Sequence, residues 1–500
     1  MRSRFKQHVF LFVIIFLILS MVLAGCSSEK TDSGASKKVN SLQIIETGDH
    51  LPPKDEDIIN KKLSEKLGVN IDLSVTASGD DYKNNINTRL AGGDYPDLFS
   101  VIDHQTLQQY AEKGLLLDLS AYKDKLKTTI DFIGEESLKK GTIDGKLYAI
   151  AARPTINYNT YWVRKDWLDK LGLKEPKTIN DLMKVAEAFT NDDPDGNGKK
   201  DTYGISGGQL NAFAPIFGAF GVGMPGDFYV KDGKLVNAYF DPDMKPALSF
   251  IKDLVSQGVV DPDLMANTGL QHQDKAFQGK VGIVWLDWPN ITKDQFVKQI
   301  KEANPKAKWV QIAAPKGPGG QYNGSWDTGA TPAIFAIPKG LKNDPKKLDK
   351  VFELLNYVSS KEGNRLVQFG VEGRDYDLKD GKVVTKPKLD EEGGYFWLYQ
   401  FTRRPEKEYL KTKFPKQQKY ITFADNQPQI QALNSYVNIP DGYNPADADA
   451  FAQQEITKFI YGKRSLDEYD QFLKKLKTTF KYQSYLDSAK KQLKDLDLIK

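Results

Sequence analysis

The sequence predicts an α/β protein of two lobes, each built on a mostly parallel sheet flanked by helices, with a helical C-terminal tail. Residues 41–102 alternate between strand and helix patterns with short turns, as in a doubly wound sheet. The chain has 500 residues, more than one hydrophobic core usually serves. Residues 447–500 carry apolar side chains at helical spacing, which indicates a helical tail that packs back on a lobe.

The first lobe is predicted from strands and helices in alternation. Period-2 patterns mark the strands, and apolar residues three or four positions apart mark the helices. In order they are strand 41–47, helix 55–67, strand 69–75, helix 81–90 and strand 97–102. Ligands of such sheets sit beyond the carboxyl ends of the strands. His50 and Asp103, with Asp49 and His104 beside them, are therefore candidate cleft residues, although solvated loops are the commoner place for them.

Residues 145–171 are predicted to cross between the two lobes. An apolar strand at 147–152 meets Pro154, which offers no amide hydrogen for sheet pairing. Tyr161 and Trp162 follow, and then a short helix. A crossing of this kind would bring aromatic side chains to a junction of domains, where ligand clefts tend to form. An ordinary strand-turn-helix within one domain is an equal alternative.

The rest of the chain supplies the second lobe and the return to the first. Thr178 to Asp181 has capping-box spacing ahead of a helix. Later strands are expected at 281–285, 308–313 and 330–337, and a long amphipathic helix at 348–358. The predicted divisions are a signal at 1–25, a tether at 26–40, a first lobe of 41–152 with 328–375, and a second lobe of 153–327 with 376–500.

The N-terminus reads as an export signal. Arg2, Arg4 and Lys6 precede a run of apolar residues that is short for a membrane-spanning helix, and Leu23-Ala-Gly-Cys26 follows. That tetrapeptide resembles the bacterial lipobox, in which the cysteine is diacylated, with palmitate for example, and becomes the mature N-terminus. We predict lipidation of Cys26 and a place on the outer face of the cell membrane. A plain secretory signal or an uncleaved anchor is the alternative.

Charge and motifs exclude several classes of protein. Without residues 1–25 the chain has 67 Lys and Arg against 66 Asp and Glu, a net charge of +1, so nothing favours nucleic acid. The four histidines are scattered, and we find no zinc spacing, nucleophile elbow or phosphate loop. Gly221-Val-Gly-Met-Pro-Gly226 fits a dinucleotide pattern, but Pro225 interrupts it and no strand leads into it, so a surface loop is expected.

One acidic loop matches a calcium site. Calcium prefers several oxygen ligands around a tight turn, and alternate positions of such a turn point inward. The matching ligands are Asp193, Asp195, Asn197, the carbonyl of Lys199, and Asp201. Position twelve is Gly204 instead of the bidentate glutamate of an EF-hand, so a structural role is expected. A metal-free surface turn is the alternative.

Aromatic residues are the second candidate signal. Sugar rings stack on aromatic faces, while carboxylates and guanidinium groups bind hydroxyls, although core packing is the commoner role of any one tryptophan. The residues that we predict to bind substrate are Trp288, Trp285, Asp287, Trp326, Trp162, Tyr161, Trp397, Tyr399, Asp103 and His50. Trp288 ranks first, since Trp285-Leu-Asp-Trp288 closely follows an apolar strand.

Several segments in a specific order carry a family resemblance. They are Leu23–Cys26, Gly93–Asp97, Trp162–Gly172, Asp193–Gly204, Tyr357–Gly363, Gly370–Gly373 and Gly462–Asp467. With them the chain resembles the family 1 extracellular solute-binding proteins of bacterial ABC importers, and within these the large Gram-positive lipoproteins related to alginate-oligosaccharide and maltose binders.

The resemblance implies a periplasmic-binding-protein type II fold, closure around an oligosaccharide, delivery to a membrane permease, and no catalysis. We also expect a monomer, and plant, algal or acidic oligosaccharides are among the expected ligands. The related alginate binders hold calcium in the loop that matches Asp193 to Asp201, but they carry an acidic residue where this chain has Thr202. The maltose binders stack sugar on a tryptophan that corresponds to Trp288. A peptide receptor is the main alternative, followed by a tethered glycosidase or lyase.

Overall fold

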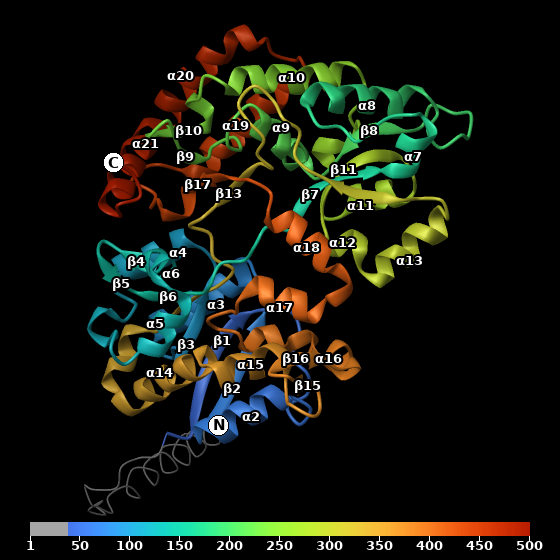
Figure 1. Ribbon diagram of the computed structural model, residues 1–500. Coiled ribbons are helices and arrows are strands. Elements are labelled where there is room, and N and C mark those ends of the chain that lie inside the picture. Colours follow the sequence, from blue (N-terminus) through green and yellow to red (C-terminus); the bar gives the residue numbers. More distant parts are fainter. Residues whose placement is uncertain (1–38) are drawn as a thin grey trace, which may run out of the picture. The chain divides into compact units, whose positions relative to one another are not determined.

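The structure, a computed structural model, describes residues 39–500 of the chain. Helices and strands alternate along these residues, and the strands form three sheets of four or five strands and two short hairpin sheets (Figure 1). The predicted α/β class is therefore confirmed. Cys26, the signal at 1–25 and most of the tether at 26–40 lie outside the described residues.

The first sheet combines a parallel half with an antiparallel half. Its strands, in spatial order, are β2 (Asn70–Thr76), β1 (Ser41–Thr47), β3 (Leu98–Val101), β14 (Ile334–Ala336) and β6 (Ala149–Ala151). β1 runs parallel to both neighbours, with Ile44 beside Leu73 and Leu98. β14 pairs antiparallel with β3 and β6, because the chain returns to this sheet from the opposite direction. The carboxyl ends of β1 and β3 and the start of β14 thus meet at one edge.

Local sequence signals set the helices that accompany this sheet. They are α2 (Ile58–Leu67), α3 (Asp80–Gly92), α4 (His104–Glu112), α5 (Lys127–Ile133), α6 (Glu135–Lys140), α14 (Pro345–Ser359) and α15 (Lys361–Phe369). The Asp57 carboxylate accepts the Asn60 amide at 2.9 Å and caps the start of α2. Gly68 ends this helix in the left-handed region at φ +62°, as predicted.

The segment predicted to cross between the lobes connects two sheets, and the limits of the lobes themselves stay a prediction. β6 belongs to the first sheet, whereas β7 (Asn159–Arg164) belongs to another sheet, so the chain passes between sheets around Pro154. Two other segments accompany it. The Ala152 amide donates to the Ala333 carbonyl at 2.9 Å, and the Arg153 amide donates to the Thr402 carbonyl at 3.2 Å. Three chain segments therefore meet where the first sheet ends.

The second and third sheets are largely antiparallel, which corrects the expectation of mostly parallel pairing. The second has the order β12 (Trp309–Ile312), β7, β11 (Val281–Asp287) and β8 (Tyr203–Ser206), and only β11 and β8 are parallel in it. The third has the order β10 (Lys234–Asn237), β9 (Phe228–Lys231), β17 (Ile430–Ala432) and β13 (Ser325–Asp327). Here a hairpin joins β9 to β10, which forces antiparallel pairing.

Helices of the second half follow the expected order. They are α7 (Lys165–Lys170), α8 (Ile179–Asn191), α9 (Ala214–Ala219), α10 (Met244–Ser256), α11 (Gln271–Phe277), α12 (Pro289–Thr292) and α13 (Asp294–Ala303). The capping box is present, since the Thr178 hydroxyl accepts the Asp181 amide at 3.1 Å and the Asp181 carboxylate accepts the Thr178 amide at 3.0 Å. The tail is helical as predicted, in α19 (Pro445–Ile460), α20 (Tyr469–Thr479) and α21 (Tyr482–Asp495).

One stretch of the later chain contacts the first sheet's helices. It contains α16 (Pro387–Glu392), the 3-10 helix η6 (Gly393–Tyr399) and α17 (Glu406–Lys413), and α18 (Gln418–Asp425) follows. The Tyr399 hydroxyl donates to the Asp57 carboxylate at 2.5 Å, and the Tyr395 hydroxyl accepts the Ile58 amide at 3.1 Å. The limits of the two lobes, including 376–500 as part of the second, stay a prediction.

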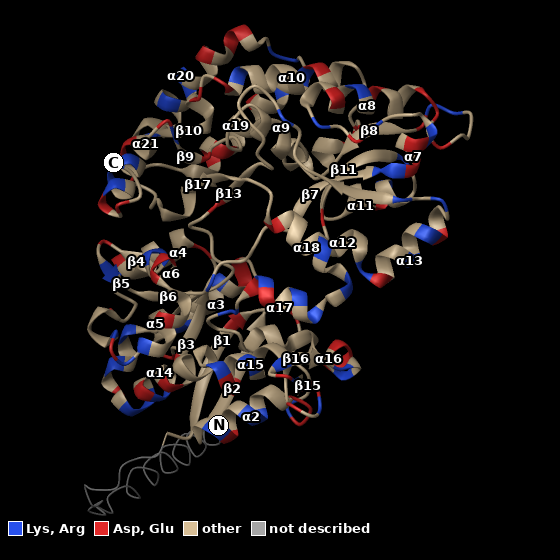
Figure 2. Ribbon diagram, viewed as in Figure 1, with Lys and Arg blue, Asp and Glu red and all other residues tan. Residues whose placement is uncertain are grey.

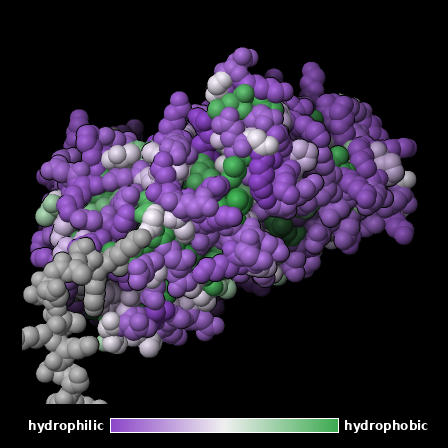
Figure 3. Space-filling model, turned by 90° about the horizontal axis from the view of Figure 1, so that it is seen from below, coloured by the Kyte–Doolittle hydropathy of each residue, from purple (hydrophilic) through white to green (hydrophobic). Residues whose placement is uncertain are grey.

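Buried apolar residues form separate clusters. One surrounds the first sheet and includes Phe99, Leu107 and Ala149. A larger one joins the second and third sheets to the helical tail, with Trp167, Phe217 and Phe472 among its members. Lys, Arg, Asp and Glu interleave along the described helices (Figure 2). Outside the grey atoms, the face in Figure 3 is mostly hydrophilic, with apolar residues in separate small areas.

Candidate functional site

A cavity of about 370 Å³ opens at the edge where the strands of the first sheet end. We call it the Arg403 pocket. Glu46 and Thr47 end β1, Ser100 and Val101 end β3, and residues 329–334 lead into β14. The remaining lining residues are Ser78, Ile102, Asp103, His104, Lys140, Trp397, Arg403 and Ser435. Parallel strands place their carboxyl ends together, so β1 and β3 bring these side chains to one edge.

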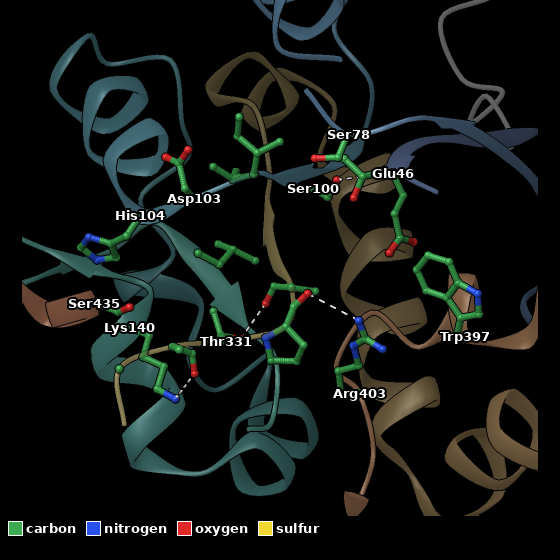
Figure 4. A pocket seen from close by; sticks show the side chains of 18 residues that line it. Glu46, Ser78, Ser100, Asp103, His104, Lys140, Thr331, Trp397, Arg403 and Ser435 are labelled. Atoms are coloured by element: carbon green, nitrogen blue, oxygen red, sulfur yellow. Dashed lines mark hydrogen bonds between the residues drawn. The ribbon is translucent and has the colours of Figure 1, made fainter. Parts of the chain in front are cut away.

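One side of the Arg403 pocket combines a carboxyl, a guanidinium and an indole ring (Figure 4). Glu46 is 5% exposed, and its Oε2 has no hydrogen-bond partner among the described residues. Burial raises the pKa of Glu46 well above its usual range, against the opposing charge of Arg403. The Arg403 guanidinium carbon lies 5.8 Å from the centre of the Trp397 ring. This side can therefore offer both acceptor and donor atoms beside an aromatic surface.

The backbone of Arg403 adopts an unusual conformation. Its φ is +59°, in the left-handed region that bulky residues rarely occupy. The side chain makes one long hydrogen bond, from Nη2 to the Pro332 carbonyl at 3.4 Å, so most of its five donors point elsewhere. Residues with strained backbone angles concentrate at ligand sites, where the placement of the side chain outweighs the free-energy cost of the backbone conformation.

The other side of the Arg403 pocket holds Asp103, His104 and Lys140 (Figure 4). Asp103 caps α4 by accepting the Thr106 amide at 2.6 Å. Burial lowers the pKa of His104 to about 4, so its ring is neutral at pH 7, and its Nε2 lacks a partner. The buried Lys140 ammonium donates to the Ala330 carbonyl at 2.9 Å. Burial lowers the pKa of Lys140, while Asp327 and Glu136 oppose that shift.

The pocket is suited to binding a polar ligand with many hydroxyl groups. It presents donors on Arg403 and Lys140, acceptors on Glu46 and Asp103, and an indole ring against which an apolar ring face can pack. Unpartnered buried polar atoms cost folding free energy, about 1–3 kcal/mol each, and a ligand that satisfies them recovers that cost. Glu46 Oε2 and His104 Nε2 are two such atoms at one site.

The structure brings two of the predicted substrate residues to this pocket, Trp397 and Asp103. His50 lies beyond β1 as an exposed residue and does not line it. Five others are at least nine-tenths buried and pack within the interior: Trp288, Trp285, Trp162, Tyr161 and Tyr399. Asp287 and Trp326 are half-buried at the ends of β11 and in β13.

Trp288 is fully buried between two other rings. Its ring centre lies 6.0 Å from that of Tyr158 and 5.6 Å from that of Phe414, both edge-on. Its indole Nε1 has no hydrogen-bond partner among the described residues. A ligand reaches this ring only if the surrounding side chains move, so sugar stacking on Trp288 stays a prediction.

Among the other lining residues, His104 was predicted beside Asp103 as a candidate cleft residue, and the sequence carries no signal for the rest. Glu46 sits in a strand pattern like any alternating polar residue, and Lys140 ends a short helix of mixed charge. Arg403, Ser435 and Thr331 come from segments without a motif. These residues lie far apart in the sequence and come together only in the folded chain, so a sequence pattern does not identify them.

The predicted calcium loop folds into a tight turn. The Asp193 carboxylate accepts the amides of Gly196 and Asn197 at 3.0 Å and of Gly198 at 3.1 Å. The Asn197 side-chain amide donates to Asp195 at 2.8 Å and to Asp201 at 3.1 Å. Burial, Asp193 and Asp201 raise the pKa of Asp195. The side chains of Asp195 and Asp201 both contact the Asn197 amide, but no group of three His, Cys, Asp or Glu among residues 39–500 is placed so that it could hold a metal ion, and calcium binding stays a prediction.

Within the described part of the chain, no helix has the length and apolarity required to cross a membrane.

Comparison with known proteins gives one family. The sequence model described as "Bacterial extracellular solute-binding protein" matches residues 51–365. A Bacillus subtilis protein named polygalacturonan/rhamnogalacturonan-binding protein YtcQ is 30% identical over 393 residues, which cover 75% of each chain. The fructooligosaccharide ABC transporter substrate-binding protein FusA of Streptococcus pneumoniae is 29% identical over 382 residues, covering 68% of each chain.

Solved structures agree on the fold. The structure of FusA in complex with kestose matches with a TM-score of 0.66 and 20% identity, covering 92% of this chain and 100% of that one. The alginate-binding protein AlgQ2, solved without calcium ion, matches with a TM-score of 0.67 and 19% identity, covering 91% of this chain and 98% of that one. These neighbours are periplasmic binding proteins of type II, so the predicted architecture is confirmed.

Proposed function

Because this chain belongs to the bacterial extracellular solute-binding proteins, we propose that it captures an oligosaccharide outside the cell and delivers it to the permease of an ABC importer. The family consists of binding proteins, and the relatives with assigned ligands carry carbohydrate names. The observation that carries the proposal is the Arg403 pocket, where Glu46, Arg403 and Trp397 offer unmet polar groups beside an aromatic ring.

Binding follows from the same contacts. The Arg403 guanidinium and the Lys140 ammonium donate to sugar oxygens, and Glu46 and Asp103 accept from hydroxyl groups. The raised pKa of Glu46 favours the protonated carboxyl, which can both donate and accept. A ligand that contacts both predicted lobes would favour a closed state by its additional contacts there. In this scheme the sugar leaves the protein unaltered.

Membrane attachment is the second part of the proposal. The lipobox-like Leu23–Cys26 would carry the lipid, and the following polar residues would serve as a tether. The protein would then work on the outer face of the cell membrane as a monomer.

A binding screen with product analysis tests the function. The purified protein is titrated in a calorimeter with neutral oligosaccharides (fructo-, galacto- and xylo-oligosaccharides), acidic ones (oligogalacturonates and alginate oligomers) and peptides. Chromatography after incubation shows whether each ligand is intact. We expect one oligosaccharide series to bind and to remain whole. Peptide binding alone would favour the peptide receptor, and shortened sugar would favour an enzyme.

Calcium in the Asp193–Asp201 loop is a further part of the proposal. Related solved structures include an EF-hand mutant of FusA and AlgQ2 without calcium ion. In this chain the carboxylates of Asp193, Asp195 and Asp201 would hold the ion, and its charge would offset their mutual repulsion. A ligand present at 100 times its Kd stabilises the folded state by about 2.7 kcal/mol.

Thermal unfolding with calcium or with EDTA tests the calcium site. We expect calcium to raise Tm and Asp195→Asn to abolish that rise. Asp232→Asn removes the same charge from an exposed hairpin turn and serves as the control. An equal response of both variants to calcium would contradict the assignment.

A further inference from the structure

A second cavity, of about 390 Å³, lies in the half of the chain that carries the helical tail. We call it the Tyr443 pocket. Its walls come from residues 209–211 after β8, residues 224–227 before β9, the chain from Asn434 to Pro445, and the helices α19 and α21 (Figure 1). None of the residues described above as candidate substrate ligands lines it.

The chemistry of the Tyr443 pocket differs from that of the Arg403 pocket. Four tyrosines line it, and the rings of Tyr443 and Tyr485 stack with centres 4.9 Å apart and 12° between their planes. The polar side chains are amides, such as Gln453 and Asn434, and two carboxyls, Asp227 and Asp449. No Lys, Arg or His among the described residues lines this cavity, so it offers an anion no opposite charge.

A buried hydroxyl in this pocket lacks a partner. Tyr443 is 6% exposed, and its Oη makes no hydrogen bond with any described residue. The neighbouring Asp227 uses one oxygen, Oδ2, for both of its contacts, with the Met224 amide at 2.8 Å and with the Ser325 hydroxyl. Burial raises the pKa of Asp227 to about 7. The pocket thus holds an unmet hydroxyl and a carboxyl that carries a proton part of the time.

The glycine pattern at 221–226 forms part of this wall. Gly226 has φ +95°, and a Cβ there would lie 3.4 Å from the Tyr239 ring. The turn lets residues 224–227 reach the cavity beside that ring. Since no cation accompanies the glycines, the loop shapes a pocket for uncharged groups and does not hold a phosphate.

Two links place the pockets side by side. Asn434 lines the Tyr443 pocket, and the next residue, Ser435, lines the Arg403 pocket. The second link is α4. His104 at its first turn lines the Arg403 pocket, while Gln108 exchanges hydrogen bonds of 3.2 and 3.4 Å with Ile439, which lines the Tyr443 pocket. His104 and Gln108 are four residues apart, about 6 Å along a helix.

We infer that the Tyr443 pocket binds an uncharged sugar residue of the same oligosaccharide whose other end occupies the Arg403 pocket. This inference rests on the proposed function. Amides and tyrosine hydroxyls both donate and accept, which suits sugar hydroxyls, and tyrosine rings suit the apolar faces of a pyranose or furanose. The ligand would therefore be longer than one residue, with its most polar end at Arg403.

Tyr443→Phe separates binding from stability. The substitution removes a buried hydroxyl that has no partner, so Tm should stay the same or rise. A neutral hydrogen bond is worth about 0.5–1.5 kcal/mol, so the loss should weaken binding by roughly 2- to 12-fold. The probe is the length ladder of whichever oligosaccharide series binds in the screen above. Calorimetry should show weaker binding of the long members and unchanged binding of the shortest.

Two further variants complete the experiment. Gln453→Ala removes an exposed amide of α19 and should produce the same length-dependent loss. Tyr122→Phe removes a tyrosine hydroxyl outside both cavities and should change nothing. Equal affinity of Tyr443→Phe and wild type at every length, or an equal loss at every length, would overturn the inference. So would choline binding that Tyr443→Ala abolishes, since loss of the ring would then assign the pocket to a cation. If the protein still binds oligosaccharides in any of these cases, only the assignment of the Tyr443 pocket fails, and the proposed function stands.

Discussion

The end of β11 and the end of β1 look alike in sequence and differ in the structure. Both are apolar strands that end at polar residues, and the motif at the end of β11, with Trp285, Asp287 and Trp288, is the richer in aromatic residues. Yet Trp288 is fully buried, whereas the ends of β1 and β3 open into the Arg403 pocket. Whether a strand end is buried or open depends on the segment that packs over it. Phe414 covers Trp288, while Trp397 and Arg403 border an open cavity.

The largest expected effect is on the stability of the β11 region. Trp288→Ala should lower the free energy of unfolding by about 3–5 kcal/mol, because it removes a buried ring that packs on Tyr158 and Phe414. Denaturant unfolding measures the change. Trp397→Ala is the matched comparison, and its half-exposed ring predicts a much smaller loss. If Trp288→Ala instead left the free energy of unfolding unchanged and weakened sugar binding, the contrast between the two regions would be wrong. Trp288 would then belong to the ligand site.

The next effect concerns affinity at the Arg403 pocket. Arg403→Gln should weaken oligosaccharide binding by about 1.5–3 kcal/mol, roughly 10- to 150-fold, since hydrogen bonds from a charged group are lost. Calorimetry measures Kd, and thermal unfolding should show little change. Lys481→Gln is the control, because Lys481 is also a cationic residue at positive φ but lies exposed on the tail. Similar effects of both variants would remove Arg403 from the ligand site.

The smallest effect is the pH dependence that Glu46 confers. Its folded-state pKa is raised above the usual 4.5, so the folded protein binds this proton more tightly than the unfolded chain does. That contribution to stability is fully present below pH 4.5 and is lost as the pH rises through the raised pKa. Glu46→Gln should therefore raise Tm at pH 7 relative to wild type, and the difference should shrink towards pH 4. A constant difference across that range would show that Glu46 titrates normally.

Local signals predicted much of the fold. Alternation, caps and turns located β1, β2, β3, α2, α14 and the tail, because these depend on neighbouring residues. Whether neighbouring strands pair parallel or antiparallel was harder to predict. β14 has three residues, and its antiparallel place beside β3 depends on where a distant segment returns. The strand expected at 330–337 is shorter in the structure for the same reason, since residues 329–333 line the pocket and pairing begins only at Ile334.

The candidate site was predictable in part. The rule that ligands sit beyond the carboxyl ends of parallel strands found Asp103 and the right edge of the sheet. Composition suggested Trp397 among many aromatic residues but could not separate it from Trp162 or Tyr161, which pack in the interior. Exposure of a ring is a tertiary property. Glu46 and Arg403 meet from positions 357 residues apart, a separation at which sequence patterns carry no information.

The left-handed backbone at Arg403 has a consequence for variation at this position. Glycine, asparagine and aspartate tolerate that conformation better than arginine does. A library of every amino acid at position 403, enriched by survival of heat alone, should drift towards those three. The same library enriched by growth on the imported nutrient should return arginine. If the two selections enrich different residues, the arginine at position 403 is kept for ligand binding although it lowers the stability of the folded protein.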